Sequence, residues 1–147
     1  MTNGEEGEGV SRPGAPRITV LFDRPERSYA PHDVMTVRHE VDGVAAASVV
    51  AFERSVVWYT EGKGEEDLGV HQFERIEGEG GTSGSIPTGG MSLRLPGSPL
   101  SYEGIIVKIR WCVRVRLFFE GGRDFVSEHV FELGAVPPAR GAVERLA

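Results

Sequence analysis

The sequence predicts an all-β protein, an antiparallel β-sandwich of about seven or eight strands. Three observations lead to this fold class. Residues 105–120 alternate between apolar and mostly polar or basic side chains over their whole length. Aromatic and β-branched residues gather in short runs separated by turns, in a chain that contains 20 glycines and 9 prolines. No long stretch has the periodicity of a helix, so strands and tight connections are the consistent interpretation.

The run from Ile105 to Glu120 is the strongest of these signals. Its odd positions are all apolar. Its even positions include four cations, Lys108, Arg110, Arg114 and Arg116. Because side chains alternate between the two faces of a strand, this run has one dry face and one basic face. Burial of the dry face is worth on the order of 10–20 kcal/mol before chain entropy is counted.

The other strands follow in chain order, each bounded by turn residues. They are expected at 17–23, 34–41, 44–60, 68–76, 91–95 and 125–133. The long third run has apolar residues on both faces, which is typical of a central strand or of a strand that bends between two sheets. Residues 1–15 and 135–147 have little to bury and are predicted to be tails, which leaves one domain at 16–134.

The last hairpin allows a prediction of register. A two-residue turn would place carboxylates on the dry face, whereas a three-residue loop, Gly121–Arg123, keeps apolar residues opposite one another. The pairs expected from this loop are Phe119 with Phe125, Val113 with Phe131, Trp111 with Leu133, and Arg116 with Glu128. His129 then faces inward opposite Val115, where a core histidine with a hydrogen-bond partner is expected rather than a catalytic one.

Composition argues against several classes of protein. The net charge of -6 argues against sequence-independent nucleic-acid binding. No apolar run approaches the roughly 20 residues that cross a membrane, and Met1–Glu8 lacks the features of a signal peptide. The single cysteine, Cys112, favours a reducing cytoplasm and a packed thiol rather than a nucleophile.

Motifs for catalysis are absent from the sequence. It contains no G-x-S-x-G, no H-E-x-x-H and no paired C-x-x-C. The glycine-rich stretch Gly78–Gly90 lacks the G-x-x-x-x-G-K-[ST] pattern that cradles phosphates, and it is interpreted as a flexible loop. We therefore expect a protein that is not an enzyme and that has no cofactor.

The basic stripe, defined as Lys108, Arg110, Arg114 and Arg116, is the strongest candidate binding site. Its chemistry suits an acidic peptide, a phosphate group or the head groups of an anionic membrane. The competing interpretation is a solvated face whose cations pair with Glu128 and Glu132 of the next strand, each pair contributing only about 0–1 kcal/mol.

A weaker alternative is a metal or small-ligand site in the charged turn and the strand after it. Its candidate ligands are Glu61, Glu65, Asp67 and His71, with Glu66 beside them. Oxygen-rich turns bind Ca²⁺, and an added histidine suits Zn²⁺. The spacing matches no defined metal motif, so an ordinary charged turn is the favoured interpretation.

Several segments together resemble the arrestin-like family. They are Tyr29-Ala30-Pro31-His32-Asp33, Leu95-Pro96, Pro99-Leu100-Ser101-Tyr102-Glu103-Gly104 and Ile109-Arg110-Trp111. Each motif is weak, but their order and spacing match over roughly residues 17–134. The resemblance implies an immunoglobulin-like sandwich of the arrestin N-domain type, with single-domain bacterial members, including the sporulation-control group, as the nearest analogy.

The resemblance also carries departures. His32 stands where the family usually has glycine, and Pro137-Pro138-Ala139-Arg140 lacks the tyrosine of the family's Pro-Pro-x-Tyr sequences. One sandwich is expected here instead of two. What the resemblance implies is a cytoplasmic adaptor or scaffold that binds protein partners, acidic or phosphorylated ones among them, through sheet edges, a sheet face or the 77–90 loop. Edge pairing would also permit a homodimer.

Overall fold

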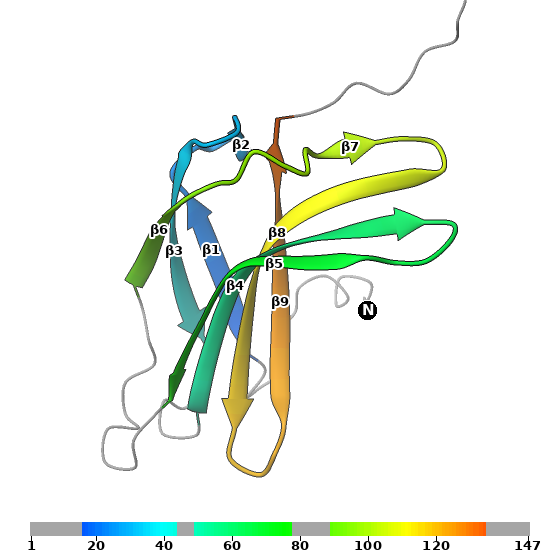
Figure 1. Cartoon of the computed structure of the whole chain (residues 1–147). Helices are drawn as coiled ribbons and strands as arrows, with labels where there is room; N and C mark the ends of the chain where they lie inside the picture. The colour runs from blue at the N-terminus through cyan, green and yellow to red at the C-terminus, as the bar shows by residue number, and fades with distance from the viewer. Residues whose placement is uncertain (1–15, 44–48, 78–88, 135–147) are drawn as a thin grey trace, which may run out of the picture.

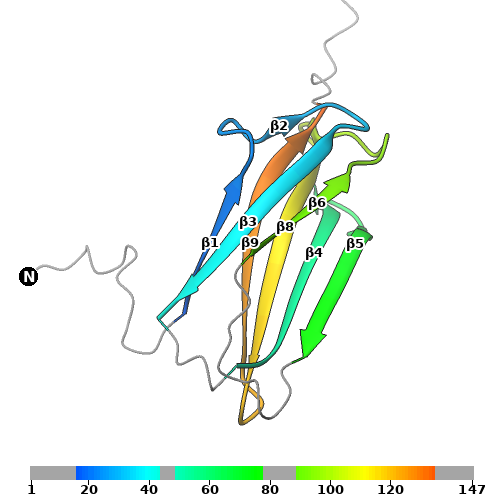
Figure 2. The ribbon, with the colours of Figure 1, turned by 90° about the vertical axis from the view of Figure 1, so that its left-hand side faces the viewer.

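The computed structural model describes residues 16–43, 49–77 and 89–134, and these form two sheets packed face to face (Figure 2). The nine strands found in these ranges are β1 Arg17–Phe22, β2 Ser28–Tyr29, β3 Val34–Asp42, β4 Val49–Gly62, β5 Leu68–Glu77, β6 Gly89–Arg94, β7 Tyr102–Glu103, β8 Val107–Phe119 and β9 Asp124–Leu133. No helix long and apolar enough to cross a membrane occurs in the same ranges. The prediction of an all-β sandwich is confirmed.

The small sheet has the order β1-β3-β6 and the large sheet the order β2-β9-β8-β4-β5, with β7 also paired to β8. Neighbouring strands are antiparallel, except that β2 pairs with β9 in parallel through two residue pairs. The run expected as a central strand is β4, which lies between β8 and β5. The expectation of a central strand is therefore met.

The core fills the space between the two sheets. Its largest buried side chains come from both layers, and they include Trp111, Tyr29, Phe52, Met35, Leu95 and Leu117. Trp111 is 1% exposed, and its indole N–H donates a hydrogen bond of 2.7 Å to the carbonyl of Pro99. The bond satisfies the one polar group of a side chain that otherwise contributes apolar surface.

The long alternating strand begins later than the sequence suggests. β8 starts at Val107, and Ile105 is 98% exposed in the connection from β7, so its assignment to the dry face was wrong. From Trp111 to Phe119 every odd position is buried, as predicted. The apolar alternation extends beyond the part of the strand that packs against the small sheet. The sequence pattern alone therefore does not show where this packing ends.

The register of the last hairpin differs from the prediction by two residues. Trp111 pairs with Phe131, and Arg114, not Arg116, pairs with Glu128. The loop is Glu120–Gly122, closed by a hydrogen bond of 2.8 Å from the N–H of Phe119 to the carbonyl of Arg123. Two consecutive glycines with φ of +88° and +91° form this turn, a conformation that favours glycine. The predicted faces are correct because a shift of two residues preserves them.

Two short strands lie in segments that the sequence presents as loops. β2 lies within the expected loop 24–33, and β7 lies within the connection 96–104. Each has only two residues, which is too short to show a period. The predicted tails, the start of the 44–60 run and most of the 77–90 loop lie outside the described residues, so the domain limits remain a prediction.

Two hairpins of the large sheet, β4–β5 and β7–β8, project away from the small sheet (Figure 1). Their tips are joined by a hydrogen bond of 3.2 Å from the N–H of Lys63 to the carbonyl of Ile106. Gly62 makes this contact possible, because a Cβ at that position would lie 2.1 Å from the Ile106 oxygen. We call this projecting part of the large sheet, residues 59–68 and 102–110, the overhang.

Candidate binding surface on the outer face of the large sheet

The face of the large sheet that points away from the small sheet is called here the outer face. All four residues of the basic stripe project from β8 onto this face, each with a carboxylate nearby. The N–O distances are 3.2 Å for Lys108–Glu103, 2.8 Å for Arg110–Glu61, 2.8 Å for Arg114–Glu128 and 2.7 Å for Arg116–Asp124. The carboxylates come from β4, β7 and β9, on both sides of the stripe.

These ion pairs largely neutralise the stripe. The hydrogen bond with Glu61 raises the pKa of Arg110, and Arg110 also lies 3.6 Å from Glu103. Among the described residues Glu132, expected as a partner of the stripe, forms no ion pair with it, although Glu132 and Arg110 line the same groove. The stripe residues are thus brought together as expected, on a surface whose charges are already paired. Their role in binding an anion stays a prediction.

The four candidate metal ligands are divided between two faces of the sheet. His71 points toward the small sheet, and its Nε2 lies 2.9 Å from the carbonyl oxygen of Arg94 on β6. Glu61, by contrast, pairs with Arg110 on the outer face. No group of three or more His, Cys, Asp or Glu side chains within the described ranges is placed to hold a metal ion.

His129 and Cys112 have the structural roles expected of them. His129 is half-buried on the inner face, opposite Val113 rather than Val115, and its Nε2 lies 2.6 Å from the hydroxyl of Ser127. Burial lowers the pKa of His129, and the positive charge of Arg27 adds to this shift. Cys112 is fully buried, which raises the pKa of its thiol to about 12. Neither side chain has the exposure or the partners of a catalytic group.

A cleft of about 460 Å³ is lined by residues of the overhang and of the middle of β8 and β9, and we call it the elbow cleft. Its lining residues come from the β4–β5 hairpin and from the middle of β8 and β9: Tyr59, Thr60, Glu61, Glu66, Asp67, Leu68, Arg114 and Glu128. Sequence analysis identified the acidic turn but not the cleft, because Arg114 and Glu128 come close to the turn only through the bend of the sheet.

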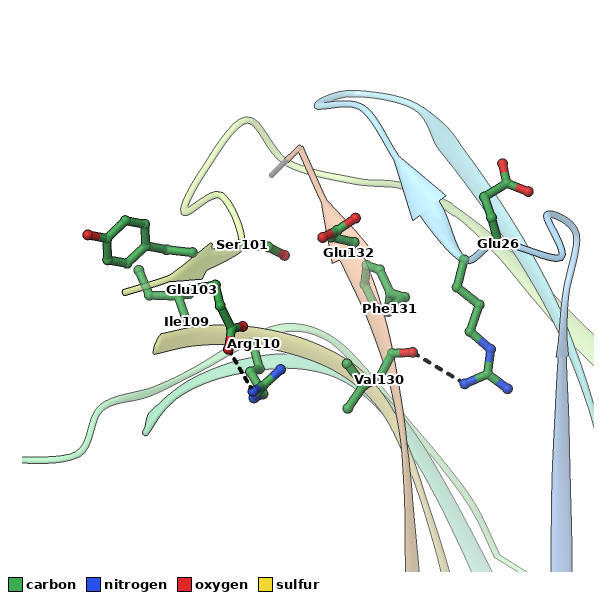
Figure 3. Close-up of a pocket in the computed structure, with 10 residues that line it drawn as sticks. Glu26, Ser101, Glu103, Ile109, Arg110, Val130, Phe131 and Glu132 are labelled. Atoms are coloured by element: carbon green, nitrogen blue, oxygen red, sulfur yellow. Dashed lines mark hydrogen bonds and ion pairs between the residues drawn. The ribbon is translucent and has the colours of Figure 1, made fainter. Parts of the chain in front are cut away.

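A second hollow of about 280 Å³, the fork groove, opens where β9 separates from β8 (Figure 3). After Phe131 the place beside β8 is taken by β7, and β9 turns toward β2. Ser101 fixes the end of β9 in this separated position through two hydrogen bonds of 2.8 Å. The N–H of Ser101 donates to the carbonyl of Leu133, and the hydroxyl of Ser101 accepts from the N–H of Leu133. The Glu103–Arg110 ion pair closes one side of the groove.

The outer face also carries an exposed row of apolar side chains along β5. Leu68, Val70 and Phe73 are each 56% exposed, although large apolar residues of strands are more commonly buried. β5 is the last strand in the order of the large sheet. We call these three residues the β5 row. Its first member, Leu68, also lines the elbow cleft, so the apolar row and the acidic cleft form one continuous surface.

By sequence, no protein-family model and no curated protein matches the chain. By structure, the fold is similar to that of Spo0M, the sporulation control protein from Bacillus subtilis, with a TM-score of 0.57 and 16% sequence identity. The match covers 84% of this chain and 51% of that chain, so the present chain spans about half the length of its structural neighbour. The expected likeness to the sporulation-control group of arrestin-like proteins is confirmed at the level of the fold.

Proposed function

We propose that this arrestin-like chain is a non-enzymatic binding module that acts in the cytoplasm as an adaptor or scaffold for protein partners. The observation that carries the proposal is the β5 row on the outermost strand of the large sheet. Exposed edge strands are normally protected by charges, prolines or very short length, because an unpaired edge recruits other strands. β5 has ten residues, contains no proline and exposes three large apolar side chains within its first six residues. Its charged residues, Glu74, Arg75 and Glu77, gather at the other end of the strand and are already engaged in ion pairs.

The fold supports this proposal, because the arrestin-like family to which it is similar is non-enzymatic. Strand addition at a sheet edge is a common mode of peptide recognition, in which backbone hydrogen bonds give affinity and alternate side chains give specificity. Among the described residues β5 pairs along one side only, and its outer face carries the β5 row, whose two-residue spacing is interrupted by the bulge at His71.

The experiment is affinity capture from native lysate with mass spectrometry, followed by a binding measurement with the purified partner. Wild type is compared with Phe73→Ser. Its matched control is Leu21→Ser, which removes a side chain of similar exposure, 50%, from β1 of the small sheet. We expect a partner that binds wild type and the control, and that binds Phe73→Ser at least tenfold more weakly.

Two outcomes would contradict the proposal. If no protein is enriched over an unrelated β-sandwich used as bait, the adaptor function is wrong. If a partner binds wild type and Phe73→Ser equally, the function stands but the β5 row is not its site. Arg114→Glu with Arg116→Glu then tests the basic stripe as the alternative surface. Circular dichroism confirms in each case that the variant is folded.

A further inference from the structure

We infer that the elbow cleft receives an arginine or lysine side chain of the protein partner, while apolar residues of the same segment cover the β5 row. This inference rests on the proposed function and specifies the chemistry of the partner. The sequence pointed to an anionic partner for the basic stripe. The arrangement of charges in the cleft points to a cationic one.

Carboxylates outnumber cations in the elbow cleft. Its lining contains four acidic side chains, Glu61, Glu66, Asp67 and Glu128, and one basic side chain, Arg114. Arg114 is neutralised by Glu128 at 2.8 Å, and Glu61 is engaged with Arg110. In the part of the chain that the structure describes, the carboxylates of Glu66 and Asp67 form no ion pair and no side-chain hydrogen bond. Two negative charges in the cleft are therefore uncompensated.

The shape and the wall of the cleft suit a long cationic side chain. A volume of about 460 Å³ lies within the range of roughly 300–1,000 Å³ that is usual for ligand pockets. Tyr59 is one of the residues that line the cleft, and an aromatic ring can bind a cation over its face. Burial is the main cause that raises the pKa of the Tyr59 hydroxyl, and the charges of Glu61 and Glu128 add smaller contributions.

The β5 row defines the rest of the segment. Leu68 lines the cleft, and Val70 and Phe73 continue the row along the free edge. A partner strand lying along this edge would place alternate side chains on the outer face. The complementary segment therefore has a basic residue near one end and apolar residues at alternate positions after it. An acidic segment would meet Glu66 and Asp67 in the cleft, where each cation of the stripe already has a carboxylate beside it. Lys63, on the same turn, does not line the cleft.

The test is an NMR titration of the full ¹⁵N-labelled chain with a capped peptide of sequence Arg-Val-Thr-Leu-Thr-Val-Ser. A second peptide, with glutamate in place of arginine, is the matched ligand control. We expect the arginine peptide to shift the amide signals of Tyr59–Leu68 and of β5. We expect it to bind at least about fivefold more tightly than the glutamate peptide, since a fivefold ratio corresponds to roughly 1 kcal/mol.

Two pairs of substitutions distinguish an effect of the cleft on peptide affinity from an effect of the protein's net charge. Glu66→Gln with Asp67→Asn removes the two uncompensated charges, and we expect the arginine peptide to bind about fivefold more weakly. Asp42→Asn with Glu120→Gln removes the same charge from exposed positions outside the cleft. This control is expected to change affinity less than twofold. Phe73→Ser should weaken both peptides alike.

Several results would overturn the inference. They are equal binding of the two peptides, equal weakening by the two charge pairs, shifts confined to another surface, and no binding at millimolar peptide. A wild-type dimer that Phe73→Ser dissociates would assign the β5 row to self-association. If capture from lysate succeeds while the peptide test fails, the inference is wrong and the proposed function stands. If the peptide binds and no partner is captured, the adaptor function is wrong and the cationic preference of the cleft stands.

Discussion

Arg54 and Glu74 form an ion pair on the inner face of the large sheet, where the Nε of Arg54 donates to Oε1 of Glu74 across 2.8 Å. The Arg54 side chain is only 11% exposed, whereas that of Glu74 is 41% exposed. A terminal nitrogen of Arg54 also lies 3.4 Å from Nδ1 of His39, a buried residue of the small sheet. A guanidinium at this depth depends on its carboxylate partner, because little water can solvate it.

Removing both partners of this pair should cost less than the sum of the costs of removing each one alone. We expect Glu74→Gln to lower the free energy of unfolding by about 1–2 kcal/mol, since it leaves a poorly solvated cation, and Glu74 itself is partly screened by water. Arg54→Met with Glu74→Met should lose less than the sum of the two single changes. Urea denaturation of wild type, Arg54→Met, Glu74→Met and the double variant measures this difference. Additive losses would show that the two side chains do not depend on each other.

His32 adopts a left-handed backbone conformation, with φ of +71°, at the position where arrestin-like proteins usually have glycine. A side chain in this region of φ is strained, and glycine relieves the strain at a smaller entropic cost. His32→Gly is therefore expected to stabilise the protein by up to about 1 kcal/mol, read as a rise in Tm by calorimetry. Ala30→Gly, at a nearby exposed position without positive φ, is the control and should lower Tm.

Burial of the Cys112 thiol predicts a loss of stability at alkaline pH. The folded-state pKa of about 12 lies above the ordinary value of about 8.5, so only the unfolded chain releases the proton between these limits. The contribution of this thiol to the free energy of unfolding should therefore be constant below about pH 8.5. Above that pH this thiol should lower it by about 1.4 kcal/mol per unit. Denaturation of wild type and Cys112→Ala between pH 7 and 10 should give a shallower decline for the variant; identical slopes would contradict the assignment.

His129 predicts the opposite dependence, on the acidic side. Because burial lowers its pKa in the folded state, the unfolded chain binds the proton first as pH falls below the ordinary value near 6.5. The contribution of neutral His129 to stability is complete above that value and is lost as pH decreases toward the folded pKa. His129→Gln should therefore flatten the Tm profile between pH 5 and 7. A wild-type profile that keeps its slope in the variant would assign the acid sensitivity to other groups.

The start of β8 can be tested by comparing two apolar residues of the alternating run. Ile105 is 98% exposed and Val113 is 1% exposed. Ile105→Ser should change the free energy of unfolding by less than about 0.5 kcal/mol. Val113→Ala should cost about 2 kcal/mol, because it leaves a gap in the core. A large loss at Ile105 in chemical denaturation would mean that the strand and its dry face begin earlier.

The fold was predictable wherever a side-chain period continued over a whole strand. From Trp111 to Phe119 the alternation predicts burial correctly, because a face of this sheet lies against a second layer. The register of the β8–β9 hairpin was not predictable from polarity, since frames that differ by two residues place the same side chains inside. The choice is made by the backbone of Gly121 and Gly122, and by which residues close the loop.

The candidate site was predictable only in part. The stripe of cations and the acidic turn could each be seen in the sequence, because each is local. Their relationship could not, because it depends on the curvature of β4 and β8. Curvature places Glu66 and Asp67 on a shared cleft with Arg114, and it leaves Leu68 exposed at the rim. Carboxylates of neighbouring strands pair with the cations of the basic stripe. The charge that remains available to a ligand is then negative instead of positive.

The overhang has a consequence for how the molecule fluctuates. Within the single strand β4, Val56 and Val57 are buried, whereas Glu61 and Gly62 are exposed although they are paired to β8 in the same way. Amide hydrogens at the tip should therefore exchange with solvent through local fraying, and those at Val56 and Val57 only through opening of the whole domain. One half of this continuous strand is then rigid, whereas the other half opens locally. A ligand that binds across the bend would slow amide hydrogen exchange at the tip and leave the exchange rates of the core amides unchanged.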